Sequence, residues 1–548
     1  MQVDVQIVDQ SQERGGLEYK WIVAIVVIFG AFMSILDQTI VNIAIPRLQN
    51  AFGADLNTVQ WVLTAYILTQ GVVTPTTAFF ADRLGTKRFY LIALAVFTIG
   101  SALCGLAWSL PILIVFRIFQ GIGGAFLFPL SITLLYNEFP LEQRGLASGI
   151  FGIAALLAPA VGPTLGGYFV TYADWPLIFY VNVPIGIAGF ILGVILLREI
   201  RSEGHIRFDI PGFLLAAVGL TLVLYALSDA STDGWTSTKV LGFLIGGVVV
   251  LAGFIAVELS IANRGGQPLV NLKLFANGPY LTSNIANILI TFAFFGGIFL
   301  FPIYLQNLRG LNAFQAGLLL LPQAFASIVT ALIGGRIVDR FGVRIVVIPG
   351  LLLLAFATWQ FTTLSLYTPY WWLQIMFVLR GLALGVIIQP LSVSALAEIR
   401  PRLFAQASSL YTVLRFVSTS LGIAVLATLV QTQAKVHYSH LAEQVTPGSR
   451  LAQVITGLQA LFRFHGADPI SAHNAAVQEV ILLVQRQGYV LAIQDAFLIS
   501  LIVTLFAIIA SALVRVRRNR TAQVQTSSST EPVRAEEEAT HQEAMMGV

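Results

Sequence analysis

Long apolar stretches alternate with short polar ones along almost the whole chain. A helix of about 20 apolar residues can cross a bilayer, and fourteen stretches come near or exceed that length. They are residues 21–45, 59–81, 89–107, 111–135, 145–171, 175–197, 210–228, 240–262, 280–303, 314–337, 345–367, 370–397, 406–431 and 490–514. Because lipid cannot satisfy an unpaired backbone, each stretch is predicted to be an α-helix. The pattern predicts an all-α integral membrane protein with fourteen transmembrane helices.

Composition supports this class. Apolar residues make up 57% of the 548 residues and charged residues only 11%, whereas soluble domains carry about 25% charged residues. So few charges could not cover the surface of a soluble protein of this size. The net charge of +4 fits basic loops and does not indicate nucleic acid. The single cysteine, Cys104, excludes an internal disulfide and is expected to be a small core residue.

Lysine and arginine are divided unevenly between the two sides of the predicted helices. With a cytoplasmic N-terminus, the short outer loops hold only Arg47, Lys239 and Arg309. The inner short loops hold Arg83, Lys87, Arg88, Arg144, Arg198, Arg201, Arg207, Arg264, Lys273, Arg336, Arg340, Arg344, Arg400 and Arg402. An even helix count returns the C-terminus to the same side, where 515–520 carries four arginines. The distribution predicts that both termini are cytoplasmic.

The chain repeats a polar turn in its two halves. "ADRLGTKR" (81–88) joins the second and third predicted helices, and "VDRFGVR" (338–344) joins the tenth and eleventh. The stretches "FRIFQGIG" and "LRGLALG", and also "PLEQRGLASG" and "PRLFAQASSL", match at a similar offset. We therefore predict two related six-helix bundles, 21–197 and 280–514, joined by a linker, 198–279, that holds two inserted helices. Paired bundles around a midplane cavity are typical of rocking transporters.

Three further segments are predicted from composition. Residues 1–20 are polar and are expected to lie in the cytoplasm. An outer loop, 432–489, contains an amphipathic pattern at 451–462 that indicates a helix lying on the membrane or capping the bundle. The tail, 515–548, is rich in Ser, Thr and Glu and is expected to be disordered.

Several motifs, taken in order, resemble those of the major facilitators, in particular the fourteen-helix drug:proton antiporters. They are "LDQTIVNIAIP" (36–46), "FFADRLGTKR" (79–88), "RIFQGIGGAF" (117–126), "APAVGPTLGG" (158–167), "WPLIFYVNVPIG" (175–186) and "YLQNLRGLNAFQAGLLLLP" (304–322). Ala78, Thr86 and Ala158 depart from the family pattern. The resemblance implies the major facilitator fold and a proton-coupled antiporter in the cell membrane. Such a protein exports small amphipathic or cationic drugs by alternating access. It uses no cofactor other than the proton gradient.

Charges inside the predicted helices are candidates for function, because a charge in hydrocarbon costs about 3 kcal/mol or more. Asp37 lies about 12 Å from the outer end of its helix and Arg117 about 9 Å from the outer end of its own. At matching depths, Asp37 is predicted to take up and release protons while Arg117 tunes it. The alternative is a permanent Asp–Arg or Asp–Gln contact that only holds helices together. Glu258 is expected to reach water, and all six histidines fall in predicted loops or tails, which excludes an intramembrane histidine relay.

Two other arginines lie inside predicted helices. Arg380 is the second-half counterpart of Arg117, but the matching helix carries no acid, so a structural role is expected. For Arg415, structural and functional roles stay equally open. The resemblance implies a substrate cavity lined by the first, fourth, fifth, ninth, twelfth and thirteenth helices. Its expected lining residues are Gln38, Asn42, Gln120, Phe295, Phe299 and Gln389.

The glycine motif in the fifth predicted helix has a mechanical interpretation. In the fifth predicted helix, Gly162, Pro163, Gly166 and Gly167 allow close helix approach and a bend, and the resemblance implies a seal typical of exporters. The alternative is ordinary tight packing.

In the repeated turns, Gly85 and Gly342 allow a tight reversal. Asp82 and Asp339 are expected near the positive end of the next helix. The resemblance implies a latch between the bundles on the cytoplasmic side, formed by Asp82, Arg83, Gly85, Lys87, Asp339, Arg340 and Gly342. The alternative is a solvated basic turn that only sets topology.

Other functions fit less well. The chain has no GxxxxGK[ST] phosphate loop, which argues against an ATP-driven pump, and neither HExxH nor GxSxG, which argues against an intramembrane enzyme. A proton symporter that imports solutes shares the fold, but the motif in the fifth helix argues against it. An exporter of lipid, siderophore or another endogenous metabolite stays open, as does the need for a periplasmic adaptor.

Overall fold

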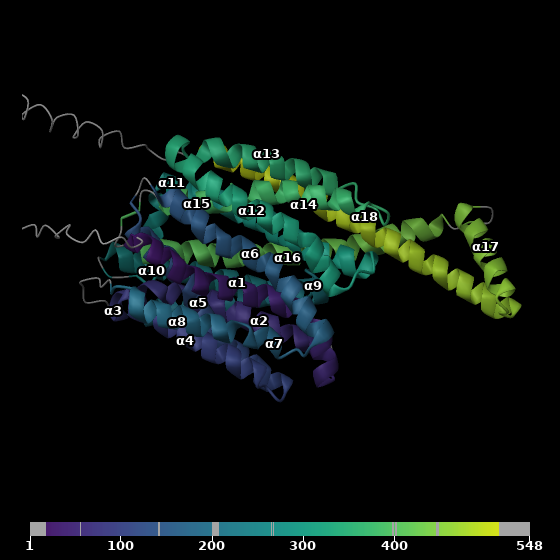
Figure 1. Cartoon of the computed structure of the whole chain (residues 1–548), viewed down its shortest axis with the longest axis horizontal. Helices are drawn as coiled ribbons and strands as arrows, with labels where there is room; N and C mark the ends of the chain where they lie inside the picture. Colours follow the sequence, from purple (N-terminus) through teal and green to yellow (C-terminus); the bar gives the residue numbers. More distant parts are fainter. Residues whose placement is uncertain are drawn as a thin grey trace, which may run out of the picture. The chain divides into compact units, whose positions relative to one another are not determined.

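Every regular element in the computed structural model of the described residues is helical (Figure 1). The structure describes residues 18–54, 56–140, 143–199, 208–264, 266, 268–396, 399–400, 403–444, 446 and 449–514. Thirteen helices within these ranges are long and apolar enough to cross a membrane. The predicted all-α membrane fold is therefore confirmed. The segment before residue 18, the tail 515–548, and Arg201, Arg207 and Arg402 lie outside the described residues.

The predicted helix at 59–81 is built from three consecutive pieces, α2 (Leu56–Val73), η1 (Thr74–Thr76) and α3 (Thr77–Leu84). Pro75 lies in η1, a short 3₁₀ turn. A proline has no backbone N–H to donate to the preceding turn, which favours a break in the α-helix at this point. The break sets α3 apart as a short helix that leads into the first repeated turn.

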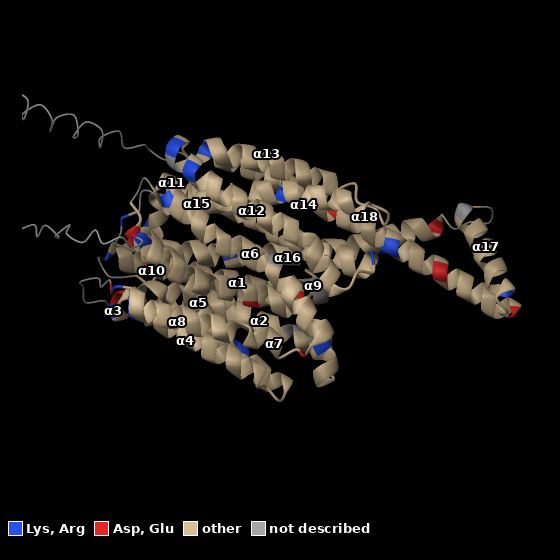
Figure 2. Ribbon diagram, in the orientation of Figure 1, with Lys and Arg blue, Asp and Glu red and all other residues tan. Residues whose placement is uncertain are grey.

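The first bundle contains the helices that lead up to Leu196. They are α1 (Tyr19–Phe52), α2, α3, α4 (Thr86–Gly105), α5 (Leu110–Glu138), α6 (Arg144–Tyr172), α7 (Leu177–Tyr180) and α8 (Asn182–Leu196). The second bundle contains α11 (Gly278–Pro302), η4 (Ile303–Leu308), α12 (Ala313–Phe341), α13 (Val343–Phe361), α14 (Tyr370–Gly385), α15 (Ile388–Leu396), α16 (Phe404–Glu443) and α18 (Pro469–Leu513). Charged residues gather mainly at the end that carries α3 and along the far parts of α16 and α18 (Figure 2).

The two bundles meet along an antiparallel seam between α6 and α12. Near the start of α6, a Cβ added to Gly335 would stand 2.3 Å from the carbonyl oxygen of Gly145. Near its end, a Cβ added to Gly317 would stand 2.9 Å from the backbone of Thr164. The backbones touch at both places because small residues leave no side chain between them. We call this contact the α6–α12 seam.

Polar contacts also join the bundles close to the start of α16. Ser409 donates to the carbonyl oxygen of Thr74 at 2.8 Å, and the hydroxyl oxygens of Ser408 and Thr133 lie 3.1 Å apart. These groups belong to α16 on one side and to η1 and α5 on the other. The bundles are therefore in contact at this end of the helices.

The inserted helices are α9 (Ile210–Asp233) and α10 (Thr238–Asn263), followed by the short η3 (Leu272–Ala276). They pack against each other, and α9 also contacts α2 of the first bundle and α16 of the second. The expectation that Glu258 of α10 reaches water is wrong, because its side chain is only 1% exposed. The connection that follows α10 folds back over it, and the backbone N–H of Val270 donates to its Oε2 at 3.3 Å.

The predicted outer loop 432–489 is largely helical. α16 continues to Glu443 and α18 begins at Pro469, so the two helices hold 40 and 45 residues, or about 60 and 68 Å. A bilayer core is about 30 Å thick. Both helices therefore extend well beyond a membrane, and we call their outer parts, with the segment between them, the arm.

The amphipathic helix predicted at 451–462 is present as α17 (Arg450–Phe464), which begins after Ser449 caps it. It packs on α18 at the far end of the arm (Figure 1). Within the arm, Nε2 of His437 lies 2.7 Å from Oδ2 of Asp495. His437 is thus in a helix and not in the predicted loop.

Candidate functional site

Asp37 and Arg117 form a buried ion pair inside the first bundle. Nη1 of Arg117 donates to Oδ2 of Asp37 at 2.5 Å, and both side chains are 0% exposed. Asp37 comes from α1 and Arg117 from α5, two helices that pack together. The matching depths inferred from the sequence therefore correspond to direct contact.

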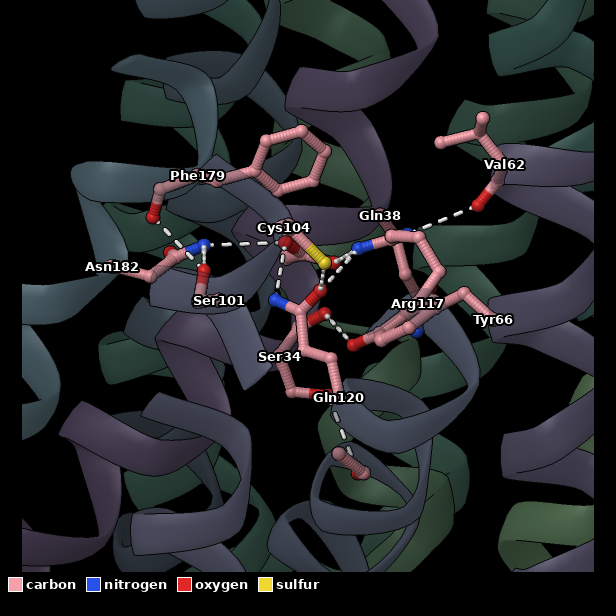
Figure 3. A network of polar contacts seen from close by, with 12 residues as sticks. Ser34, Gln38, Val62, Tyr66, Ser101, Cys104, Arg117, Gln120, Phe179 and Asn182 are labelled. Atoms are coloured by element: carbon pink, nitrogen blue, oxygen red, sulfur yellow. Dashed lines mark hydrogen bonds and ion pairs between the residues drawn. The ribbon is translucent and has the colours of Figure 1, made fainter. Parts of the chain in front are cut away.

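Two amides complete the shell around Asp37. Gln120, one turn beyond Arg117, donates to Oδ1 at 2.9 Å, and Asn182 of α8 donates to the same oxygen at 3.2 Å. Asn182 also donates to Ser101, whose hydroxyl donates to the carbonyl oxygen of Phe179 (Figure 3). With three donors, the carboxylate charge of Asp37 is well compensated.

The guanidinium of Arg117 is held on several sides. Its Nε donates to the carbonyl oxygen of Val62 at 3.0 Å, and Nη1 also donates to Gln120 at 2.7 Å. The ring of Tyr66 lies beneath it, with 3.9 Å between the guanidinium carbon and the ring centre, a favourable cation–π distance. Only Nη2 lacks a hydrogen-bond partner among the described residues. This cluster of Asp37, Arg117, Gln120 and Asn182, which we call the charge cluster, is closed to water.

Sequence reasoning missed Asn182 and misplaced Gln120. Gln120 was expected to line the substrate cavity, but it is 0% exposed and belongs to the charge cluster. Asn182 lies in the stretch 175–186, which contributes to the sequence prediction only through its resemblance to the family motif. An amide in an otherwise apolar run was the available signal for it.

The neighbouring residues of α1 point away from the charge cluster. Gln38 donates to Gln70 of α2 at 2.8 Å, and Asn42 is exposed and donates to the carbonyl oxygen of Gln38 at 3.1 Å. Thr39 donates to the carbonyl oxygen of Ala158 in α6 at 3.3 Å. One turn of α1 therefore touches the charge cluster, α2 and α6.

The remaining predicted cavity residues differ in their surroundings. Gln389 of α15 is buried against α6, where a Cβ added to Gly152 would stand 2.8 Å from it. Phe295 packs on Phe294 within the second bundle, and Phe299 is 36% exposed. A pocket does lie between α6 and the second bundle. It is lined by Leu156, Pro159, Phe294, Ile298, Phe301, Leu320, Gln323, Ala324, Ser327 and Leu384.

The glycine motif of α6 lies against α1 and α12. A Cβ on Gly162 would stand 2.2 Å from Oγ1 of Thr39, and one on Gly166 would stand 2.9 Å from Ile40. Gly167 faces Phe314 at the start of α12. The helix continues unbroken from Arg144 to Tyr172 through both of its prolines, Pro159 and Pro163. The motif brings three helices into close contact.

Both repeated turns contain a glycine with positive φ, +88° at Gly85 and +93° at Gly342. Side chains other than glycine rarely adopt this conformation. The carboxylate at the start of α4, however, is not that of Asp82 but that of Glu199. It accepts from the backbone N–H groups of Lys87 and Arg88 at 3.1 and 3.3 Å. The hydrogen bonds to the start of α4 are therefore made by Glu199, and the proximity of Asp82 to this helix end stays a prediction.

Asp82 lies inside α3, one turn before that glycine. Burial raises the pKa of its carboxyl from 3.8 to about 6. Arg83 lies over the ring of Phe79, 5.8 Å from its centre. The ammonium of Lys87 donates to the carbonyl oxygens of Val194 and Leu197, within the first bundle. The contact between the bundles at this point is that of α3 with α16.

In the second turn, the side chain of Asp339 lies outside the described residues. Arg340 lies over the ring of Phe341, 5.3 Å from its centre, and Arg344 donates to the carbonyl oxygen of Val514. The second turn is thus tied to the end of α18 in its own bundle.

The two further arginines differ in their surroundings. Arg380 is 3% exposed, donates to the carbonyl oxygen of Phe294 at 3.1 Å and lies 4.8 Å from the ring centre of Phe301, all within the second bundle. Arg415 is partly exposed and reaches across to α5, where it stacks on Phe128 with 3.7 Å to the ring centre. Arg415 therefore lies between the two bundles.

These features define a membrane transporter built from two helical bundles. Residues 27–423 match the family model of the Major Facilitator Superfamily. The chain belongs to this superfamily. It is a multi-pass protein of the cell membrane, a secondary transporter of small molecules and not an enzyme.

Two relatives and one solved structure illustrate its similarities. The chain is 36% identical to an uncharacterised MFS-type transporter of Bacillus subtilis over 77% of its own length and 79% of that protein. It is 33% identical to the tetracenomycin C resistance and export protein of Streptomyces glaucescens over 75% and 76%. The crystal structure of the human organic anion transporter MFSD10 shares the fold, with a TM-score of 0.58, 14% identity, and coverage of 89% of this chain and 100% of that one.

Proposed function

We propose that the chain is a proton-coupled antiporter of the fourteen-helix drug exporter branch, which exports small amphipathic compounds by alternating access. The observation that carries the proposal is the buried Asp37–Arg117 pair, 2.5 Å apart within a cluster closed to water. A charge pair inside a membrane bundle is costly and marks functional sites. The similarity to the Streptomyces glaucescens relative, a resistance and export protein, supports export as the direction of transport.

The mechanism follows from what one proton would change. Protonation of Asp37 removes the charge that Nη1 of Arg117 faces at 2.5 Å and leaves the guanidinium without its counter-ion. Breaking a buried pair in this way costs several kcal/mol unless the structure rearranges. The favoured rearrangement separates α1 from α5. Proton uptake therefore destabilises this packing of the first bundle.

α1 also connects the charge cluster to the rest of the protein. Thr39, two residues after Asp37, contacts α6 at Ala158 and Gly162, and α6 forms the α6–α12 seam with the second bundle. A displacement of α1 is thus passed to the contact between bundles. Rocking of one bundle against the other is the general mode of alternating access in such folds.

The basic loops support a membrane orientation with both termini in the cytoplasm. In that orientation the start of α16, with its contacts between Ser409 and Thr74, lies on the cytoplasmic side. The arm then projects outward. Proton entry would occur from the outside and drug release to the outside.

Efflux from proteoliposomes tests the proposal. Purified protein, an imposed pH gradient and a panel of dyes and quaternary amines would be used with the wild type and with Asp37→Asn. We expect gradient-driven efflux from the wild type and only the passive leak of empty liposomes from the variant. Asp174→Asn, an exposed carboxyl, is the matched control and should transport normally. Undiminished efflux by Asp37→Asn would remove Asp37 from the mechanism.

A second substrate class, an anionic endogenous metabolite, is favoured by Arg415. Its backbone lies about 17 Å along α16 from Phe404. Its guanidinium stacks on Phe128 of α5, and it forms no ion pair with a described carboxylate. A cation without a counter-ion between the bundles attracts anionic groups and repels cationic drugs. Arg415→Gln should then reduce export of anionic aromatic dyes at least tenfold and spare cationic ones. The reverse selectivity would favour cationic drugs.

A further inference from the structure

Two carboxyl groups face each other inside the protein at one end of the inserted helices. Asp209 is the N-cap of α9 and Glu258 lies near the C-terminal end of α10. Their side chains are 9% and 1% exposed. The charge cluster of the first bundle does not include them, so they form a separate acidic site, which we call the inserted-pair site.

In each carboxyl group one oxygen accepts a hydrogen bond, and the other has no donor in the part of the chain that the structure describes. Oδ1 of Asp209 accepts from the backbone N–H of Gly212 at 2.9 Å, and Oε2 of Glu258 accepts from that of Val270 at 3.3 Å. Oδ2 of Asp209 and Oε1 of Glu258 are buried and have no donor among the described residues. Two unpartnered acceptors are thus aimed into the same site.

Gly212 shows how closely the free oxygens converge. A Cβ added to this glycine would stand 2.3 Å from Oδ2 of Asp209 and 2.5 Å from Oε1 of Glu258. Both oxygens therefore crowd one point on the surface of α9. Any side chain larger than glycine would displace at least one of them.

No described cation neutralises the inserted-pair site. On the α10 side, Lys273 of η3 donates to the carbonyl oxygen of Ala262, and Arg264 is exposed. On the side of the first bundle, Arg83 lies over the ring of Phe79. None of the three forms an ion pair with either carboxyl in the described part of the chain.

Two adjacent buried carboxylates with no cation paired to them among the described residues would be strongly unfavourable, because burial and like charge both disfavour ionisation. A proton between Oδ2 and Oε1 converts this repulsion into a short, charge-assisted O–H···O hydrogen bond. It also gives both unpartnered oxygens a partner. A metal ion fits less well, since Ca²⁺ requires six to eight oxygen ligands and Mg²⁺ an octahedron, and the site offers two free oxygens.

We propose that Asp209 and Glu258 bind one proton, shared between their free oxygens, and that this bound proton holds the start of α9 against α10. The site is separate from the transport mechanism proposed above and does not depend on it. It gives the inserted helices a role in sensing protons at the end of the bundle that carries the first repeated turn.

The site is connected to that turn by an aromatic contact. Phe208, the residue before Asp209, packs on Phe79 of α3 with 4.7 Å between ring centres and on Phe213 with 5.6 Å. Loss of the proton would push Asp209 away from Glu258 and would move Phe208 with it. Proton release is therefore expected to loosen α3 as well as the start of α9.

Amide exchange of full-length protein in nanodiscs, measured by mass spectrometry from neutral to strongly alkaline pH, tests the proposal. After correction for intrinsic exchange rates, the wild type should exchange at least tenfold faster at residues 210–214 once the proton is lost. In Glu258→Gln, the amide donates permanently to Oδ2 of Asp209, so protection should persist at alkaline pH. Asp209→Asn should behave in the same way, because its amide can donate to Oε1 of Glu258.

Glu443→Gln, an exposed carboxyl in the arm, is the matched control and should keep the exchange profile of the wild type. An identical alkaline change in the wild type and in both amide variants would overturn the proposal. If Na⁺, K⁺ or Ca²⁺ restores protection to the wild type at alkaline pH, the site binds a metal ion and the proton assignment is wrong. If neither variant folds, the wild-type measurement alone tests the proposal. Unchanged amide protection of residues 210–214 at alkaline pH would then overturn it.

Discussion

Arg117 donates to Asp37 at 2.5 Å in a place where neither side chain is exposed. A pair of this kind stabilises the fold only while both partners are present, since an unpaired buried charge is far more costly than a neutral pair. The relationship therefore makes predictions about stability that do not depend on a transport assay.

Removal of Arg117 alone should destabilise the folded protein more than removal of both Arg117 and Asp37. We expect Arg117→Gln to cost about 3–5 kcal/mol of stability, because Asp37 is left buried without its counter-ion. The double variant Asp37→Asn/Arg117→Gln should recover much of this loss. Thermal unfolding of detergent-purified protein measures both, and equal losses in the single and double variants would contradict a coupled pair.

Asn182 should support the charge cluster without being essential to it. Asn182→Ala removes donors to Asp37 and Ser101, and a lost hydrogen bond to a buried charged group costs about 1–3 kcal/mol. The melting temperature and the rate of gradient-driven efflux should both fall, and neither should vanish. Asn42→Ala, which removes an exposed amide of α1, is the comparison and should leave the melting temperature nearly unchanged.

Asp82 should make stability depend on pH in a defined direction. Burial raises the pKa of its carboxyl from 3.8 to about 6, so the folded protein favours the protonated form. The stabilisation is full below about pH 4 and is lost as the pH rises through about 6. Asp82→Asn should therefore raise the melting temperature at pH 8 and leave it unchanged at pH 4.

The same melts on Asp174→Asn provide the control, because that carboxyl is exposed and its removal should change neither value. A melting temperature for Asp82→Asn below that of the wild type at pH 8 would mean that the charged form of Asp82 has a stabilising partner.

The α6–α12 seam should not tolerate a single added methyl group. A Cβ on Gly335 would stand 2.3 Å from the carbonyl oxygen of Gly145, so Gly335→Ala should force the helices apart and cost about 1–3 kcal/mol. The matched control is Gly253→Ala in α10, whose Cβ would meet nothing within 4 Å. It should be neutral or slightly stabilising, since alanine favours helix. Equal melting temperatures for the two variants would argue against close packing at Gly335.

The sequence was a good guide to the helices and to one charged contact. Transmembrane helices are defined mainly by length and composition, and thirteen of the fourteen apolar stretches correspond to described helices that are long and apolar enough to cross a membrane. The remaining stretch, 59–81, is divided among α2, η1 and α3. The depth of Asp37 and Arg117 along their helices could be estimated because the helical rise is constant. The depth of the two residues along their helices was enough to predict that they interact.

The direction in which a side chain points around its helix was not predictable in the same way. Gln120 and Gln38 both looked like cavity residues, but Gln120 turns into the charge cluster and Gln38 towards α2. Direction depends on which neighbours each helix packs against. The burial of Glu258 likewise depends on a connection that folds back over α10, and Glu199 reaches Lys87 across 112 positions of the chain.

The arm was misjudged for a different reason. Helices surrounded by water carry polar residues. The apolar run in the sequence therefore stops at the membrane surface even where the helix continues. α16 and α18 each run without interruption from the second bundle into the arm, so a small tilt within the bilayer becomes a much larger displacement at the far end of the arm. The arm therefore acts as a lever. A fluorescent label near Phe464 would report a motion of the second bundle as a displacement of the label outside the membrane.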